Sequence, residues 1–364
     1  MLRRSRLVVA LALMATMALI FVSLSTYGRG AIITEGLQES KSSNLVMDNS
    51  AQVNSLGTED KAPNAPTDED TSKEQQQQIT DSSPQPAQPS HLTLDEMRNK
   101  ARDTMEPKGK KIVVLTATDG KGNNGAIENL IEMVTENREE YCAYHDYVYQ
   151  FINISKYHID GRPPVWSKIP AIQESFEINS GAEWVWLLDT DAIIMTPQID
   201  LAKHILDPES MKTRIAYDAP ITLTDGKPSG LTVSRDIDVQ NIDMIIAQDE
   251  IGVNAGSILF RRSEWTKSLL QNWVHPDHVK QHANEQDALN YLIINNDDIR
   301  KHTAILPQRV INAFSVGGEN MGWVTGDLAV HFAGCWVDNA CDSRWKDFWS
   351  RRVTVSETIA SHQS

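Results

Sequence analysis

The sequence predicts an α/β fold with a mostly parallel central sheet, in a single globular domain over residues 108–350. Two observations support this prediction. Short apolar runs over residues 110–118, 147–154 and 184–188 alternate with stretches of helical spacing, and this rhythm is typical of βαβ units. The 184–188 run is apolar throughout, as expected of a strand that is buried on both faces of a parallel sheet.

The other elements follow in chain order. We expect helices over 126–144, 166–178, 199–206, 263–273 and 285–292, and strands over 244–247, 254–260 and 328–332. Asp207-Pro208 should end the third helix, while Ser263 and Asn284 occupy N-cap positions of the last two. The polar, glycine-containing residues 223–238 should form a loop over a substrate.

The chain before the domain is expected to form a membrane anchor and a disordered stem. Three arginines within residues 1–6 precede an uncharged run over 7–27, which is about long enough to cross a bilayer. Basic residues on the short side predict a cytosolic tail at 1–6, and a cleaved signal peptide is the alternative. Residues 28–107 are rich in Ser, Gln and Pro, which predicts a stem without a core. Residues 351–364 should form a C-terminal tail.

Charge and cysteine content narrow the class of protein. The net charge of −15, without a concentrated basic stripe, excludes a nucleic-acid partner. Cys142, Cys335 and Cys341 are too few for a disulfide framework, although the last two are close enough to close a small loop in a lumenal compartment. Asn153 begins a glycosylation sequon, and we expect the adjacent apolar strand to limit access to it.

Two carboxylates, Asp189 and Asp191, follow the 184–188 strand at once. In open α/β sheets, ligands bind at the carboxyl ends of such strands. Mg²⁺ and Mn²⁺ prefer oxygen ligands, take one or two protein carboxylates and complete their shells with water and substrate phosphates. An Asp-X-Asp alone is usually a turn, but apolar residues on both sides place this pair inside the domain. The pair therefore predicts a metal–diphosphate site.

Three further groups have both a structural and a functional interpretation. The small residues 254–256 would let a ligand approach the backbone closely, and a tight turn into a strand explains them equally well. Glu285 and Gln286 either face a cleft from a helix N-terminus or simply start the helix. A single histidine such as His331 on an apolar strand is usually a core residue.

Taken together, five segments resemble the fungal galactosyl/mannosyltransferase family of retaining Golgi glycosyltransferases, glycosyltransferase family 34. The segments are Trp184–Met195, Asn254–Ser257, Arg262–Trp265, Glu285–Leu289 and His331–Cys335. The resemblance covers about residues 110–349. It implies a GT-A-type nucleotide-diphospho-sugar transferase domain in a single-pass type II Golgi membrane protein, with the catalytic head in the lumen.

The resemblance also implies roles for individual residues. Asp189, Asp191 and His331 would bind the metal, and the imidazole favours Mn²⁺ over Mg²⁺. Gln286, with Glu285 before it, would form the catalytic face against the transferred sugar. The donor-binding residues would be Thr116, Lys168, Asp189, Asn254, Ala255 and Gly256. Plant members carry a lysine where this chain has Trp336. A positive charge that stabilises the leaving phosphate must therefore come from another residue or from the metal.

The function implied is α-1,6-mannosyltransferase-like transfer of mannose from GDP-mannose to N-glycan or mannan acceptors on glycoproteins, within a hetero-oligomeric Golgi mannosyltransferase complex. A UDP-galactose-dependent α-1,2-galactosyltransferase is the alternative within the family. A non-catalytic glycan-binding or scaffolding subunit of a Golgi transferase complex is a second alternative. A metal-dependent phosphohydrolase is a third, and the sequence lacks the further acidic or histidine cluster that a two-metal site needs.

Overall fold

The computed structural model describes residues 111–121 and 126–361. The predicted cytosolic tail, the predicted anchor over 7–27 and the predicted stem over 28–107 lie outside these described residues. Within the described ranges, no helix combines the length and the apolar character needed to cross a bilayer.

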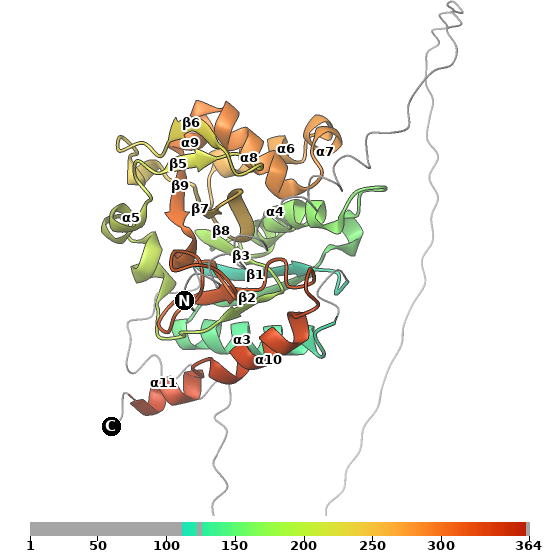
Figure 1. Ribbon diagram of the computed structural model, residues 1–364, viewed down its shortest axis with the longest axis vertical. Coiled ribbons are helices and arrows are strands. Elements are labelled where there is room, and N and C mark those ends of the chain that lie inside the picture. Colours follow the sequence, from blue (N-terminus) through green and yellow to red (C-terminus); the bar gives the residue numbers. More distant parts are fainter. Residues whose placement is uncertain (1–110, 122–125, 362–364) are drawn as a thin grey trace, which may run out of the picture. The chain divides into compact units, whose positions relative to one another are not determined.

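A six-stranded sheet forms the centre of the domain, in the order β2-β1-β3-β8-β7-β9 (Figure 1). Its strands are β1 (Ile112–Thr118), β2 (Val148–Asn153), β3 (Trp184–Leu188), β7 (Met244–Asp249), β8 (Gly252–Arg261) and β9 (Thr303–Pro307). Of these six, β8 alone runs antiparallel to its neighbours, which confirms a mostly parallel sheet. β1 and β3 are buried along their whole lengths, because helices cover both faces.

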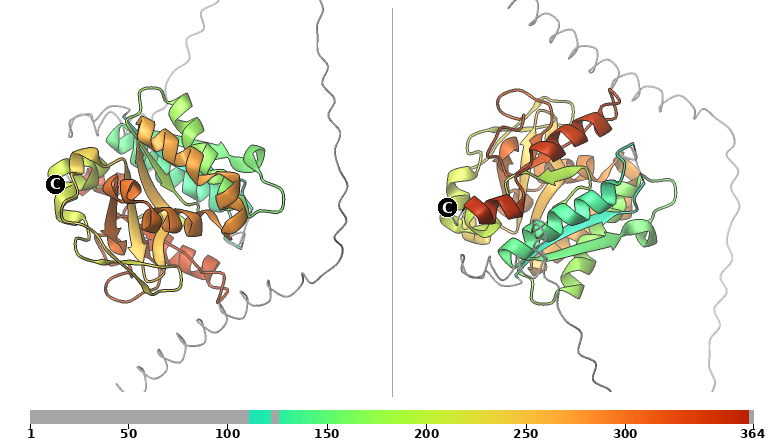
Figure 2. Two further views of the ribbon diagram at one scale, coloured as in Figure 1. Left: turned by 90° about the horizontal axis from the view of Figure 1, so that it is seen from above. Right: turned by 90° about the horizontal axis from the view of Figure 1, so that it is seen from below.

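The order of the strands explains how the helices come to lie on opposite faces. α3 (Leu130–His145) connects β1 to β2, and α4 (Lys168–Ile178) connects β2 to β3. Because β2 and β3 flank β1 on opposite sides, two right-handed crossovers place α3 and α4 on opposite faces. In Figure 2, α6 (Glu264–Trp273) and α8 (Glu285–Asn295) share the face of α4, and α10 (Cys341–Arg351) shares that of α3.

A second, three-stranded sheet lies beside the first, in the order β10-β11-β4. It consists of β4 (Ala192–Ile194), β10 (Ala313–Phe314) and β11 (Ala329–His331). Its side chains pack with α3 and α10 in a separate apolar cluster that includes Val134, Ile193, Val330, Phe332, Trp345 and Phe348. Only residues 189–191 separate β3 from β4, so the chain passes from one sheet to the other through the acidic turn.

The shorter elements confirm one sequence prediction and correct another. A short helical segment over Ala202–Leu206 ends at Asp207, whose N–H donates to the Ala202 carbonyl at 2.8 Å, so the predicted helix end is confirmed. Asp207 also begins α5 (Pro208–Arg214), because its carboxylate accepts from the Ser210 backbone N–H at 2.9 Å and proline suits the first helical position. The predicted loop over 223–238 contains β6 (Pro228–Thr232), paired with β5 (Pro220–Thr222). Two short helices, α7 (Pro276–Gln281) and α9 (Asp297–Lys301), were not predicted from the sequence.

The predicted C-terminal tail also needs correction, because the fold continues past residue 350. α11 (Val355–Ser361) follows α10, and its Val355 and Ile359 side chains are buried. The Thr354 hydroxyl accepts from the Glu357 N–H at 3.2 Å, and the Glu357 carboxylate accepts from the Thr354 N–H at 2.8 Å. This reciprocal pair is a capping box, so the domain extends through residue 361.

Candidate functional site

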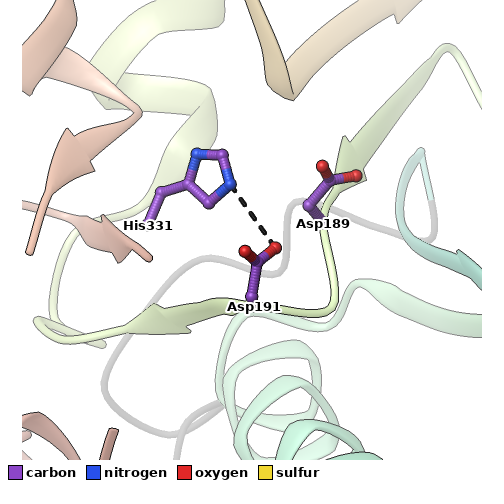
Figure 3. A group of neighbouring side chains, drawn as sticks. All are labelled: Asp189, Asp191 and His331. Atoms are coloured by element: carbon purple, nitrogen blue, oxygen red, sulfur yellow. Dashed lines mark ion pairs between the residues drawn. The ribbon is translucent and has the colours of Figure 1, made fainter. Parts of the chain in front are cut away.

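Asp189, Asp191 and His331 come together where the two sheets meet. Asp189 follows β3, Asp191 precedes β4, and His331 ends β11. β11 runs antiparallel to β4 with His331 opposite Ala192, which brings the imidazole beside Asp191. One ligand atom from each of the three residues lies within 4.8 Å of the other two. Figure 3 shows the imidazole directed at Asp191, with the Asp189 carboxylate to the right of this pair at the end of β3.

The surroundings of His331 fit a metal ligand. Its Nε2 lies 3.4 Å from Asp191 Oδ1, while its buried Nδ1 has no hydrogen-bond partner among the described residues. Gly256 on β8 lies against the ring, and a Cβ added there would stand 2.1 Å from His331 Cε1. Two carboxylates and one imidazole are a donor set that suits a divalent cation such as Mn²⁺.

Asp191 and His331 also shift each other's pKa. Burial by itself would raise the pKa of the Asp191 carboxyl, but the adjacent imidazole outweighs it and holds that pKa below its usual value. Burial likewise opposes the charged form of His331, and the Asp191 carboxylate outweighs it and raises the pKa of the imidazole. The pair therefore stabilises negative charge at Asp191 in a buried position.

Lys168 joins the acidic turn to the start of α8. Its Nζ lies 2.9 Å from Asp189 Oδ1 and 3.0 Å from Glu285 Oε1. Burial opposes the charged ammonium, but Asp189 and Glu285 together outweigh this and raise the pKa of Lys168. The Glu285 side chain, only 6% exposed, is thus paired with the lysine and does not face an open surface.

The predicted donor segment 254–256 lies inside β8 and is hydrogen-bonded to both the acidic turn and α8. The Asp189 N–H donates to the Gly256 carbonyl at 2.8 Å. The Ala255 N–H donates to Gln286 Oε1 at 2.9 Å, which holds the Gln286 amide against the strand. Asn254 Oδ1 accepts from the Gly256 N–H at 3.1 Å. These contacts place the segment and Gln286 beside the metal-ligand residues.

Thr116 lies at the carboxyl end of β1, the same edge of the sheet. Leu115 is paired with Leu187, so Thr116 is one position further toward the acidic turn. The side chain is fully buried and its Oγ1 has no partner among the described residues. The structure thus brings every predicted site residue to the carboxyl ends of β1 and β3 or to the elements packed against them.

Two polar residues of α3 that were not predicted from the sequence hydrogen-bond the main chain at and just after the acidic turn. Arg138 on α3 donates from Nη2 to the Asp189 carbonyl at 2.6 Å and to the Ala192 carbonyl at 3.4 Å. Its neighbour Asn137 bonds both the N–H and the C=O of Ile194, at 2.8 and 3.0 Å. No sequence signal marks these residues, because polar side chains on an amphipathic helix normally face water.

Two more missed residues hold Asn254. Asn312, which is completely buried, donates from Nδ2 to Asn254 Oδ1 at 2.8 Å. Asp249 Oδ2 accepts from Asn254 Nδ2 at 3.1 Å, and burial raises the pKa of the Asp249 carboxyl. The Asn254 amide is therefore held at both its nitrogen and its oxygen, so residues of the fold itself set its orientation.

A disulfide joins Cys335 to Cys341, as their spacing allowed, and closes the loop that follows β11. This loop carries Trp336, whose side chain is partly exposed. Asn153 is exposed at the end of β2, so the expectation of poor access to the sequon was wrong. The hydroxyl-bearing Ser155 lies in the short 3₁₀ turn that follows.

Residues 108–342 match the model of the galactosyl transferase GMA12/MNN10 family. The chain belongs to this family. As a GMA12/MNN10 family member it is a hexosyltransferase, which confirms the predicted class of enzyme and excludes the phosphohydrolase alternative.

Named relatives differ in the sugar that they transfer. The probable alpha-1,2-galactosyltransferase gmh2 of Schizosaccharomyces pombe is 37% identical, over 71% of this chain and 76% of that protein. The probable alpha-1,6-mannosyltransferase MNN10 of Saccharomyces cerevisiae is 31% identical, over 63% of each chain. Among solved structures, a glycosyltransferase involved in glycosylation of the major capsid of PBCV-1 is 14% identical, with a TM-score of 0.45, over 65% of this chain and 98% of that one.

Proposed function

We propose that this family member is a retaining, metal-dependent glycosyltransferase of the GT-A type. It transfers a hexose from a nucleotide-diphospho-sugar to a glycan acceptor on a glycoprotein. The observation that supports this most directly is the convergence of Asp189, Asp191 and His331 on one turn, beside the buried Lys168 and the Gln286 amide. A non-catalytic subunit would not need two carboxylates and an imidazole held this close inside a domain.

For the donor we propose UDP-galactose, which was the alternative to the GDP-mannose predicted from the sequence. Two relatives at 37% identity are both named probable alpha-1,2-galactosyltransferases. GDP-mannose stays as a second candidate, because a relative at 31% identity is named a probable alpha-1,6-mannosyltransferase. Donor hydrolysis measured with each nucleotide sugar, alone and in competition, separates the two.

Asp189, Asp191 and His331 would hold the divalent cation, with Mn²⁺ fitting the mixed oxygen and nitrogen donors. When bound, such a cation acts as a Lewis acid that stabilises negative charge on a leaving diphosphate. Lys168 keeps the Asp189 carboxylate in place through its 2.9 Å contact. Gly256 leaves the room that the buried His331 ring needs beside the turn.

Gln286 is proposed to stand against the sugar ring, where its amide dipole stabilises positive charge that develops at C1. A neutral amide is a poor nucleophile, and Glu285 is paired with Lys168 at 3.0 Å, so we propose no covalent intermediate on either side chain. The acceptor oxygen instead bonds to C1 from the same face as the C1–O(phosphate) bond breaks. The acceptor proton passes to a leaving phosphate oxygen, and the configuration at C1 is retained.

A transfer assay on the full chain tests this function. We expect sugar transfer with Mn²⁺, loss of transfer in a chelator, and recovery when Mn²⁺ is restored. Asp191→Asn should reduce turnover by about 100-fold or more, since it replaces a charged carboxylate ligand with a neutral amide, and NMR of the product should show the donor's anomeric configuration. Full turnover in the chelator would overturn the metal-dependent mechanism, and an inverted product would overturn the same-face route.

We further propose that residues 7–27 anchor the chain in the Golgi membrane as a type II protein with a lumenal head, and that it works in a hetero-oligomeric transferase complex. The Cys335–Cys341 disulfide supports an oxidising compartment. Protease protection of the head in sealed microsomes checks the orientation, and degradation of the head without detergent would contradict it. Affinity purification under mild detergent checks the complex.

A further inference from the structure

Arg138 on α3 is a buried cation to which neither the family resemblance nor the proposed reaction assigns a role. Its side chain is completely inaccessible to solvent. Its Nη2 donates to the Asp189 carbonyl at 2.6 Å and to the Ala192 carbonyl at 3.4 Å, and its Nη1 donates to the Val134 carbonyl of its own helix at 3.3 Å. The guanidinium therefore bridges the residue that opens the acidic turn and the residue that follows it.

Burying a guanidinium costs desolvation free energy unless hydrogen bonds or opposite charges offset it. The hydrogen bonds seen for Arg138 within the described residues all go to main-chain carbonyls. An arginine side chain is not deprotonated in proteins, so Arg138 brings a positive charge next to the main chain of the acidic turn.

The backbone of the turn shows what this cation controls. The Asp189 N–H is already held by the Gly256 carbonyl at 2.8 Å, and the Asp191 carbonyl by the Phe332 N–H at 2.8 Å. The Asp189 carbonyl is the remaining polar group of that residue's main chain, and Arg138 holds it. With both of its polar main-chain groups fixed, the backbone of Asp189 keeps its position relative to Asp191 and His331, so its side chain starts from a defined place in the turn.

We propose that Arg138 is a positioning residue for the divalent cation: it fixes the acidic turn from behind so that the Asp189 and Asp191 carboxylates face one point. Its charge also reduces the repulsion between these two carboxylates. The inference rests on the proposed metal-dependent function. It assigns to Arg138 the role that outer-shell partners have in metal sites, where they orient the ligands without touching the ion.

The neighbouring Asn137 provides a matched control. It lies on the same helix and also bonds the main chain after β3, but its partner is Ile194 in β4, beyond the turn. Arg138→Lys keeps the positive charge but has one nitrogen in place of the planar fork, so it cannot hold the Val134 carbonyl and the turn carbonyls through separate nitrogens. Asn137→Ser removes a comparable pair of hydrogen bonds and leaves the acidic turn untouched.

The test is Mn²⁺ binding to the full chain without donor, measured by EPR of free Mn²⁺, together with the thermal midpoint in chelator. We expect Arg138→Lys to raise the Kd for Mn²⁺ about tenfold, as loss of an outer-shell partner typically does, and Asn137→Ser to leave it within about twofold. Should Arg138→Lys not fold, Arg138→Gln serves as the second variant, with the same expectation.

Two results overturn the inference in distinguishable ways. If the Arg138 variant and Asn137→Ser lower the thermal midpoint alike while both bind Mn²⁺ as tightly as the wild type, Arg138 has only a structural role. If the wild type binds Mn²⁺ no better than Asp191→Asn, the proposed metal site itself is wrong, and the role of Arg138 falls with it.

Discussion

Lys168 and Glu285 form an ion pair of 3.0 Å between side chains that are 8% and 6% exposed. The same ammonium lies 2.9 Å from Asp189, so one buried lysine is shared between carboxylates from two separate elements. Through this contact the start of α8, where Gln286 lies, is fixed relative to the acidic turn. Charge pairing, and not apolar packing alone, thus sets the distance between the proposed metal site and the proposed sugar site.

Removing the lysine should therefore destabilise the domain. We expect Lys168→Met to lower the free energy of unfolding by about 3–5 kcal/mol, because it leaves the buried Glu285 carboxylate and the partly buried Asp189 carboxylate without their cation. Urea denaturation in chelator measures the change. The double variant Lys168→Met/Glu285→Gln should recover part of the loss, since it removes one of the two orphaned charges. A loss below about 1 kcal/mol would show that the pair behaves like a surface salt bridge.

Gly256 should not tolerate a side chain. In Gly256→Ala the new Cβ would stand 2.1 Å from His331 Cε1, so the imidazole must move away from Asp191. We expect a stability loss of about 1–3 kcal/mol, measured by denaturant unfolding, and weaker Mn²⁺ binding. Gly181→Ala is the matched control, because nothing lies within 4 Å of a Cβ added there. Equal effects of the two substitutions would contradict the packing seen at His331.

Acid should destabilise the domain through His145. Burial lowers the pKa of this histidine to about 4, while its Nε2 bonds the Pro197 carbonyl at 2.7 Å. The unfolded chain takes up a proton near pH 6.5 and the folded chain only near pH 4, so stability falls as pH decreases between these values. The loss through this residue is about 3 kcal/mol at most.

The variant His145→Gln isolates this effect, because it keeps a hydrogen-bond donor but cannot titrate in that range. We expect its free energy of unfolding to fall less steeply than that of the wild type between pH 6.5 and pH 4. Chemical denaturation at several pH values measures both slopes. Parallel slopes would mean that His145 is protonated as easily in the folded chain as in the unfolded one.

The Cys335–Cys341 disulfide closes a short loop, so its contribution should be moderate. We expect Cys335→Ser/Cys341→Ser to lower the free energy of unfolding by about 2 kcal/mol, mainly because the unfolded chain gains freedom. Thermal unfolding of the double variant, compared with wild type under oxidising conditions, measures this. If reducing agent lowers the wild-type midpoint but not that of the variant, the effect belongs to this bond.

Local patterns predicted much of the fold correctly. The apolar run of β3, the Ser263 cap of α6 and the Asn284 cap of α8 are all confirmed. They were predictable because burial on both faces and cap hydrogen bonds depend on residues within a few positions of each other. Asp207 was correctly placed at the end of a helical segment, but only the structure shows that its carboxylate also caps the start of α5.

The sequence by itself determined that two carboxylates follow a buried strand and that a helix begins with Glu285 and Gln286. Tertiary structure alone decided that His331 joins the carboxylates, that Lys168 bridges Asp189 to Glu285, and that Arg138 lies behind the turn. The reason is physical: strand register and helix crossover bring these residues together from distant parts of the chain. No residue's local preferences specify which distant residue it will contact.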